Sequence, residues 1–130
     1  LEDAQRGIQR MAFWEDPSVK ALSSGMDALW QKQQVISHNI ANVETPGYKA
    51  KHVEFKEVLK KTEDGGEPVK EYRTVVSVDE ATQARADGNN VQVESEELEL
   101  WKTYVEYSTL TSRMSKKFSS LRYVINNAGK

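Results

Sequence analysis

The apolar positions in the N-terminal third of the chain recur every three or four residues, which is the period of one face of an α-helix. This N-terminal stripe is interrupted only by the polar Gln33 and extends over 25 residues, or about 37 Å of helix. Asp16 and Pro17 predict the helix start, because Asp caps free amides and Pro at the first position has no amide to leave unpaired. The apolar members of the stripe are Val19, Leu22, Met26, Leu29, Ile36, Ile40 and Val43.

A second helical stripe lies near the C-terminal end, with an unbroken spacing of four and three residues. Ser95 predicts the N-cap of this helix, and the segment 126–129 predicts its end. Glutamates come early in the segment and basic residues come late, an order that opposes the helix dipole at both ends. The members of this C-terminal stripe are Leu100, Tyr104, Tyr107, Thr111, Met114, Phe118, Leu121 and Ile125.

The segment between the two helices has a different character. Residues 52–55 and 71–78 have the composition of β-strands, and residues 62–68 between them predict a loop. A helical turn or two is expected over residues 55–61, and residues 87–90 predict a tight turn. Few of the side chains here are large and apolar, so this insert is too thin to build a core of its own.

We therefore expect one domain of mainly α class. Its long N- and C-terminal helices pair as a coiled coil, and a short irregular β-containing insert lies between them. Residues 1–10 carry no stripe that continues downstream, and we interpret them as a vector-derived remnant or an upstream extension. The N-terminal helix and its closing turn then take residues 11–48, the insert takes 49–94 and the C-terminal helix takes 95–130.

Composition excludes several classes of protein. The formal net charge is −2 and the pI is near 5.8, so the chain lacks the surplus of Lys and Arg that a duplex nucleic-acid binder needs. With no cysteine, it has no disulfide framework, Cys-ligated metal or thiol nucleophile. No apolar run approaches the roughly 20 residues of a membrane-spanning helix, so we expect no membrane insertion. The start of the chain has no pattern typical of a cleaved signal peptide.

The sequence gives no positive support for catalysis. The two histidines, His38 and His52, form no metal-binding spacing, and no serine stands in a nucleophile-elbow context. The glycines occur in turns and make no phosphate-binding loop. We therefore predict no catalytic, cofactor-binding or metal-ligating residues and no cofactor.

Some apolar side chains are left over once the two stripes face each other. Leu98, Trp101 and Val105 form a second apolar edge on the C-terminal helix, and Trp30 and the pair Phe13-Trp14 add to this surplus. Burying one large apolar side chain gains about 1.5–3 kcal/mol, and a contiguous exposed patch is unusual for a monomer. We therefore expect these residues to meet another protein chain.

The end of the first helix also carries a specific motif, in which Asn-x-x-Asn is followed shortly by Thr-Pro-Gly-Tyr. It resembles the motif of the flagellar axial family of rod, hook and hook-associated proteins. The resemblance extends upstream to residues 24–29 and 33–36, and downstream to residues 87–91 and 118–125. The motif residues are Asn39, Ile40, Ala41, Asn42, Thr45, Pro46, Gly47 and Tyr48.

The length of the insert between the two helices indicates which members of that family the chain resembles most. Distal rod and hook subunits carry large inserted domains, whereas this insert has only about 45 residues, as in a short proximal rod subunit. The uninterrupted Thr45–Tyr48 and the following residues 49–55 resemble one of the two proximal rod proteins; its sister usually has a longer, glycine-rich run after the Thr. The sister subunit and a cytosolic helical-hairpin adaptor remain alternatives, and a small hydrolase has no supporting constellation.

The resemblance implies a structural, non-enzymatic protein of the basal-body rod in the periplasm. Family members reach that place unfolded, through the flagellar type III export apparatus and without a cleaved signal. The implied partners are other rod subunits, further copies of the same chain, and basal-body adaptor and export-gate proteins, with no nucleic acid. Under this interpretation the helix stripes pack subunits together, and Pro46 and Gly47 set the angle between helix and insert. Asn39 and Asn42 are expected to bond backbone groups near the turn.

Overall fold

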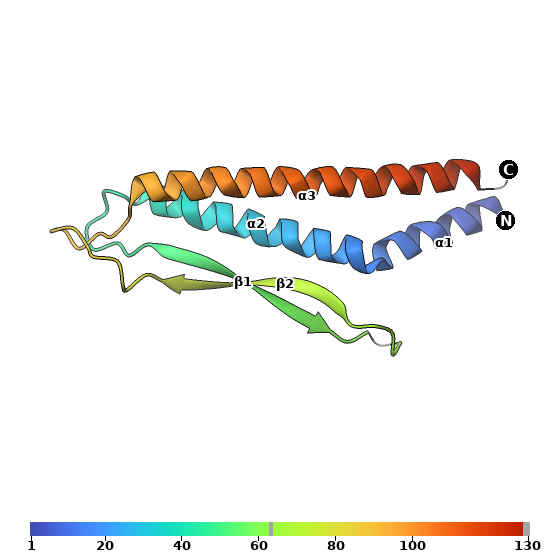
Figure 1. The fold of residues 1–130 in the computed structure, drawn as a ribbon, viewed down its shortest axis with the longest axis horizontal. Helices are drawn as coiled ribbons and strands as arrows, with labels where there is room; N and C mark the ends of the chain where they lie inside the picture. Colours follow the sequence, from blue (N-terminus) through green and yellow to red (C-terminus); the bar gives the residue numbers. More distant parts are fainter. Residues whose placement is uncertain (63, 129–130) are drawn as a thin grey trace.

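The computed structural model describes residues 1–62 and 64–128. It contains three helices and one β-hairpin. Helix α3 lies along helix α2, the hairpin lies on the other side of α2, and α1 continues beyond α2 so that both termini lie at one end of an elongated molecule (Figure 1). The elements are α1 (Glu2–Glu15), α2 (Pro17–Ala41), β1 (Lys51–Lys60), β2 (Val69–Val78) and α3 (Val93–Asn127).

The start of α2 at Asp16-Pro17 is confirmed. The Asp16 carboxylate accepts hydrogen bonds from the backbone amides of Ser18 (2.8 Å) and Val19 (3.4 Å), and Pro17 is the first helical residue. The Ser18 hydroxyl donates a further bond of 2.6 Å to the same carboxylate, and this bond is the largest cause that holds the pKa of Asp16 below its ordinary value. Upstream of this cap the chain forms α1, a helix for which the sequence patterns had predicted no element.

The start of α3 differs from the prediction. The helix begins at Val93, two residues before the predicted N-cap Ser95, and no side chain caps its first amides. Val91, whose backbone amide bonds the Asn89 side chain, leads directly into the helix. Just upstream, the side chains of Asn89 and Asn90 donate to the carbonyls of two distant residues, Asn42 and Asp79. At the other end α3 runs to Asn127, and Gly129 of the predicted terminus lies outside the described residues.

The N-terminal stripe of α2 contributes three of the eight buried apolar side chains among the described residues, and α2 packs against α3 on one side and the hairpin on the other. Val19, Leu29 and Ile36 are buried, and so is the polar Gln33. The remaining apolar members of the stripe are half-buried: Leu22, Met26, Ile40 and Val43.

Helix α3 turns a slightly different face toward α2 than its stripe predicted. Thr103 is fully buried and Leu110 reaches Gly25 of α2, whereas Tyr104 is 55 % exposed and Phe118 packs instead on Phe13 of α1, with ring centroids 5.0 Å apart. The small Thr103 lets the two helices approach, and its hydroxyl is satisfied by donating to the Glu99 carbonyl at 2.7 Å. The half-buried stripe members are Leu100, Tyr107, Met114, Leu121 and Ile125, and Thr111 is exposed.

The insert is a regular antiparallel hairpin in which Lys51 pairs with Val78 and Lys60 pairs with Val69. The helical turns expected over residues 55–61 were wrong, because β1 continues through them to Lys60. Pairing with β2 satisfies the backbone groups of this stretch, which local composition alone could not show. No described helix is long and apolar enough to cross a membrane.

Candidate functional site

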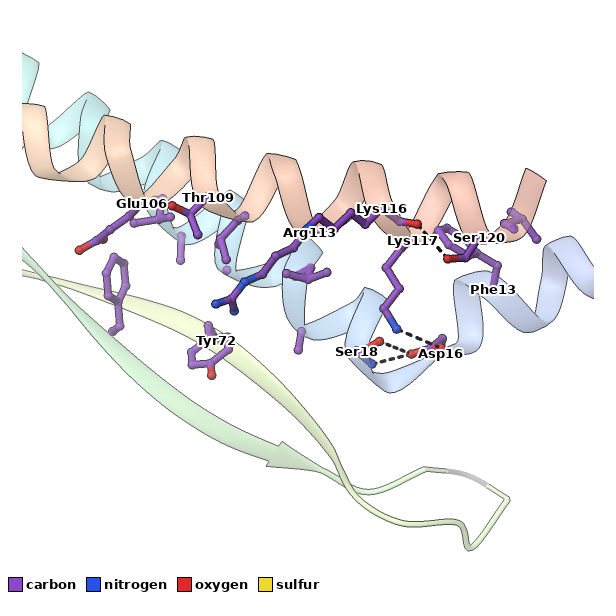
Figure 2. A pocket seen from close by; sticks show the side chains of 18 of the residues that line it. Phe13, Asp16, Ser18, Tyr72, Glu106, Thr109, Arg113, Lys116, Lys117 and Ser120 are labelled. Atoms are coloured by element: carbon purple, nitrogen blue, oxygen red, sulfur yellow. Dashed lines mark hydrogen bonds and ion pairs between the residues drawn. The ribbon is translucent and has the colours of Figure 1, made fainter. Parts of the chain in front are cut away.

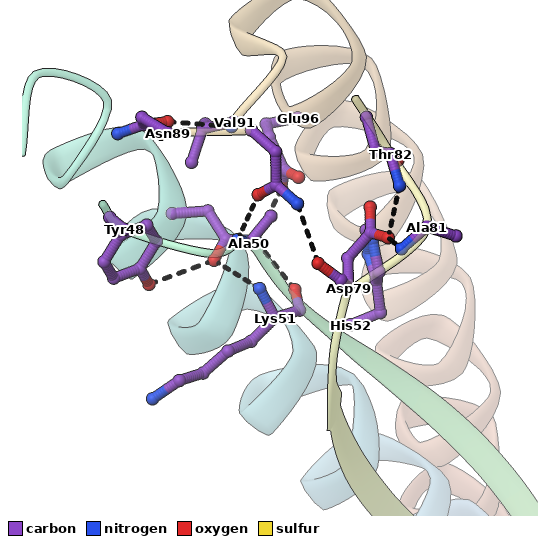
Figure 3. A network of polar contacts seen from close by, with 12 residues as sticks. Tyr48, Ala50, Lys51, His52, Asp79, Ala81, Thr82, Asn89, Val91 and Glu96 are labelled. Carbon is purple, nitrogen blue, oxygen red and sulfur yellow. Dashed lines mark hydrogen bonds and ion pairs between the residues drawn. The ribbon is translucent and has the colours of Figure 1, made fainter. Parts of the chain in front are cut away.

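The motif at the end of α2 forms a polar joint between three parts of the chain. The Asn39 side chain is fully buried, and its amide nitrogen donates to the Lys51 carbonyl (2.7 Å) and the Glu96 carboxylate (3.1 Å). Its oxygen accepts from the Lys51 amide (3.0 Å) and the Tyr48 hydroxyl (3.2 Å) (Figure 3). One side chain therefore links α2, the start of β1 and the first turns of α3.

The second Asn of the motif closes the helix end. Asn42 donates to the His38 carbonyl at 2.8 Å and accepts from the Thr45 hydroxyl at 3.1 Å. The buried Asn89 side chain then donates to the carbonyls of both Asn42 (2.8 Å) and Thr45 (2.9 Å). The expected bonds from Asn39 and Asn42 to backbone groups near the turn are thus present. The sequence did not reveal Asn89 as their partner, because residues 87–90 carried only the composition of a turn.

The Thr-Pro-Gly-Tyr segment forms the turn that its sequence predicts. The Tyr48 amide donates to the Thr45 carbonyl at 3.2 Å, and Gly47 has φ of 73°, as the third position of a type II turn requires. The Gly47 amide in turn donates to the Asp87 carbonyl at 2.8 Å. A Cβ on Gly88 would lie 3.3 Å from the Gly47 Cα, so two glycines allow the two turns to touch.

Asn90 ties this joint to the hairpin. Its oxygen accepts from the Ala50 amide (2.6 Å) and its nitrogen donates to the Asp79 carbonyl (2.7 Å), so it bridges the residues that flank the two strands. The Asp79 carboxylate accepts hydrogen bonds from Thr82, and His52 lies 3.2 Å away. These bonds, led by that of the Thr82 side chain, hold the pKa of Asp79 far below its ordinary value of 3.8.

One carboxylate, that of Glu96, is buried in the joint. It accepts from Asn39 and sits in the first turns of α3, where the helix dipole favours negative charge. Burial raises the pKa of the neighbouring Tyr48 phenol, and the Glu96 charge adds to this increase. The arrangement is that of a satisfied structural network. Within the described residues, no group of His, Asp and Glu side chains could hold a metal ion.

The second notable feature is an open apolar groove of about 1140 Å³. Helix α2 forms its floor, α3 forms one wall and the hairpin forms the other (Figure 2). The Arg113 side chain reaches from α3 toward Tyr72 of the hairpin, while Lys117 points to Asp16, with which it forms an ion pair of 4.0 Å. The apolar lining includes Leu22, Leu29, Phe55, Leu110, Leu121 and Val124.

The surplus apolar side chains mostly lie on the surface. Leu98 and Trp101 are exposed, with Trp101 at 65 %, and Val105, Trp30 and Trp14 are exposed as well. Phe13 differs from the prediction, because it is buried against Phe118. The long helix pair therefore leaves both a groove and an apolar edge without an intramolecular partner among the described residues.

The structure combines a buried polar joint, a long helix pair and exposed apolar surface. These features are typical of a structural protein that packs against other proteins. A profile described as "Flagella basal body rod protein" matches residues 20–49, which hold most of α2 and the whole motif. Flagellar basal body rod protein FlgB of Bacillus subtilis is 35% identical, over 83% of this chain and 92% of its own length. The corresponding FlgB proteins of Aeromonas hydrophila and Borreliella burgdorferi are 32% and 28% identical over 70% and 77% of this chain, and 79% and 89% of their own lengths.

The chain therefore belongs to the family of the flagellar basal body rod protein FlgB. This is a family of structural proteins of the flagellum and not of enzymes.

Proposed function

We propose that this chain is a proximal rod subunit, exported unfolded by the flagellar type III apparatus and polymerised through its terminal helices into the shaft that transmits torque. The observation that carries the proposal is the apolar groove along α2 and α3, which the chain itself leaves open. A neighbouring subunit that covered this groove would bury side chains worth about 1.5–3 kcal/mol each.

The same structure suits a chain that must unfold before export. Its buried apolar core is small, and the chain has no cysteine that could form a disulfide. Assembly would add the burial that the free subunit lacks, with the stripes of α2 and α3 continuing into coiled-coil contacts with neighbouring helices. In this proposal the motif joint from Asn39 to Tyr48 fixes the angle at which the hairpin leaves the helix pair.

The proposed partners are other rod subunits and further copies of this chain, with basal-body adaptor and export-gate proteins at the base of the rod. The proposed location is the periplasmic rod. A cytosolic adaptor is the alternative, because the family assignment already separates the chain from the sister proximal rod subunit. Fractionation of cells distinguishes the adaptor from the rod subunit, because a rod subunit travels with purified basal bodies.

We expect that Leu121→Asp abolishes rod assembly and motility while export continues. Leu121 is half-buried and lines the groove, so a carboxylate there would be desolvated by any neighbour that packs on it. The measurement is swimming in soft agar, together with the amount of the protein exported to the periplasm, in a strain that carries only the variant.

Ser119→Asp is the matched control. Ser119 is exposed and does not line the groove, so this substitution adds the same negative charge outside the groove lining. Normal motility of the Leu121→Asp strain would overturn the assignment of the groove as an assembly surface. Loss of motility in both strains would show that the added charge acts elsewhere.

A further inference from the structure

The two uncovered apolar surfaces have complementary charges. Between residues 93 and 106, α3 carries five glutamates and one lysine, whereas between residues 107 and 127 it carries four basic residues and no acidic one. The exposed edge of Leu98, Trp101 and Val105 lies in the acidic half, and the α3 wall of the groove lies mainly in the basic half. Two parallel copies whose α3 helices lay side by side in register would therefore place like charges next to each other, which is unfavourable.

The dimensions of the groove suit the binding of an α-helix. Its α3 lining runs from Val105 to Val124, which is about 28 Å along the helix. Leu98, Trp101 and Val105 have the i, i+3, i+7 spacing of the anchors that a helix places in a groove. Within the described ranges, Arg113 and Lys116 of the groove pair with no carboxylate.

We propose that the exposed edge on the acidic half of α3 in one copy sits in the groove beside the basic half of α3 in the next copy. The inference rests on the proposed function and names the surfaces that a polymer of this chain would join. The two surfaces share only Val105, which lies at one end of the groove lining, so each copy uses its edge on one neighbour and its groove on another. Such a heterologous contact between parallel copies repeats without closing, as a shaft requires.

The residue positions define the offset between copies. A shift of 19 residues, about 28 Å along a parallel helix, brings Glu94 beside Arg113 and Glu97 beside Lys116. The same shift places Trp101 beside Ser120 and Val105 beside Val124. Ser120 and Val124 both line the groove, so the large indole meets a small side chain over an apolar floor.

The absence of native cysteine allows a direct test with single engineered thiols in the full chain. We expect that a mixture of the Val105→Cys and Val124→Cys proteins forms disulfide dimers under mild oxidation, and that neither protein does so alone. A chain with both substitutions is expected to give a ladder of multimers. The two positions lie about 28 Å apart on one helix, so no intramolecular disulfide competes. Tyr123→Cys, an exposed neighbour outside the groove lining, is the control for Val124→Cys.

Charge exchange tests the same contact in solution. Lys116→Glu is expected to weaken self-association about tenfold in a sedimentation series, and Glu97→Lys in the same chain is expected to restore it. Arg122→Glu makes the same charge change outside the groove lining and should have little effect. Cross-linking of Val105→Cys with itself, closed dimers from the double-thiol chain, or a monomer at every concentration would each overturn the inference. Each of these outcomes leaves the rod assignment standing if the protein still purifies with basal bodies.

Discussion

A single amide, that of Asn39, joins three segments of this chain. It makes four hydrogen bonds, to Lys51, Tyr48 and Glu96, in a fully buried position. A buried polar group is tolerated when each of its bonds is made, and it is costly when a partner is removed. At the residue scale, the motif is thus explained by hydrogen-bond satisfaction.

We expect Asn39→Ala to lower the free energy of unfolding by about 3 kcal/mol, because it leaves the Lys51 backbone groups and Glu96 without their partner. Asn39→Asp keeps the size but places a carboxylate against Glu96, so it should be at least as destabilising near neutral pH. Urea unfolding followed by circular dichroism measures both. Gln34→Ala, an exposed change on the same helix, is the control. A loss for Asn39→Ala no larger than that of the control would remove the structural role of the joint.

The decrease of the free energy of unfolding at acid pH depends in part on Asp79. Hydrogen bonds from Thr82 hold its pKa below the ordinary 3.8, so the folded state favours the ionised carboxylate. The stabilisation is therefore fully present above that ordinary value and is lost as pH falls below it. Asp79→Asn should have a shallower fall in unfolding free energy between about pH 5 and about pH 2 than the unchanged chain. Urea titrations at several pH values check this, and equal slopes would contradict it.

At the scale of elements, helix α3 is rotated relative to the prediction. The face that packs against α2 is offset from the C-terminal stripe. The aromatic positions Tyr104 and Phe118 follow a perfect spacing, but Thr103 and Leu110 lie against α2. Adjacent rows of one helix share the same period, so periodicity alone does not distinguish them. The row with the smaller residue allows the closer approach of the two helices.

This orientation leads to a test in which two neighbouring positions respond differently. Thr103→Tyr overfills the buried seam and should destabilise the chain by about 1–3 kcal/mol or more. Tyr104→Ala removes a large but exposed ring and should change stability by less than about 0.5 kcal/mol. Both are measured by urea unfolding at low protein concentration, where self-association does not contribute. The opposite ranking would mean that α3 presents its aromatic row to α2.

At the scale of the whole molecule, the chain is a thin layered body with more apolar surface than it covers. The hairpin packs on α2, where the Tyr72 amide bonds the Ser24 hydroxyl at 3.1 Å, and Lys32 links α2 to Glu99 of α3 at 3.2 Å. These contacts hold the layers in place but leave the groove between hairpin and α3 open. Under the proposed function, a neighbouring subunit would cover this groove.

The sequence by itself determined the two long helices, the cap at Asp16, the turn at Gly47 and the family, because each depends on local periodicity or on a short specific motif. Only the tertiary structure decided that residues 55–60 are a strand, since a strand needs a distant partner to satisfy its backbone. It also decided that Asn89 and Asn90 complete the motif joint and that Thr103, not Tyr104, lies in the seam. These features depend on contacts between segments far apart in the chain, and no local pattern records which segments will meet.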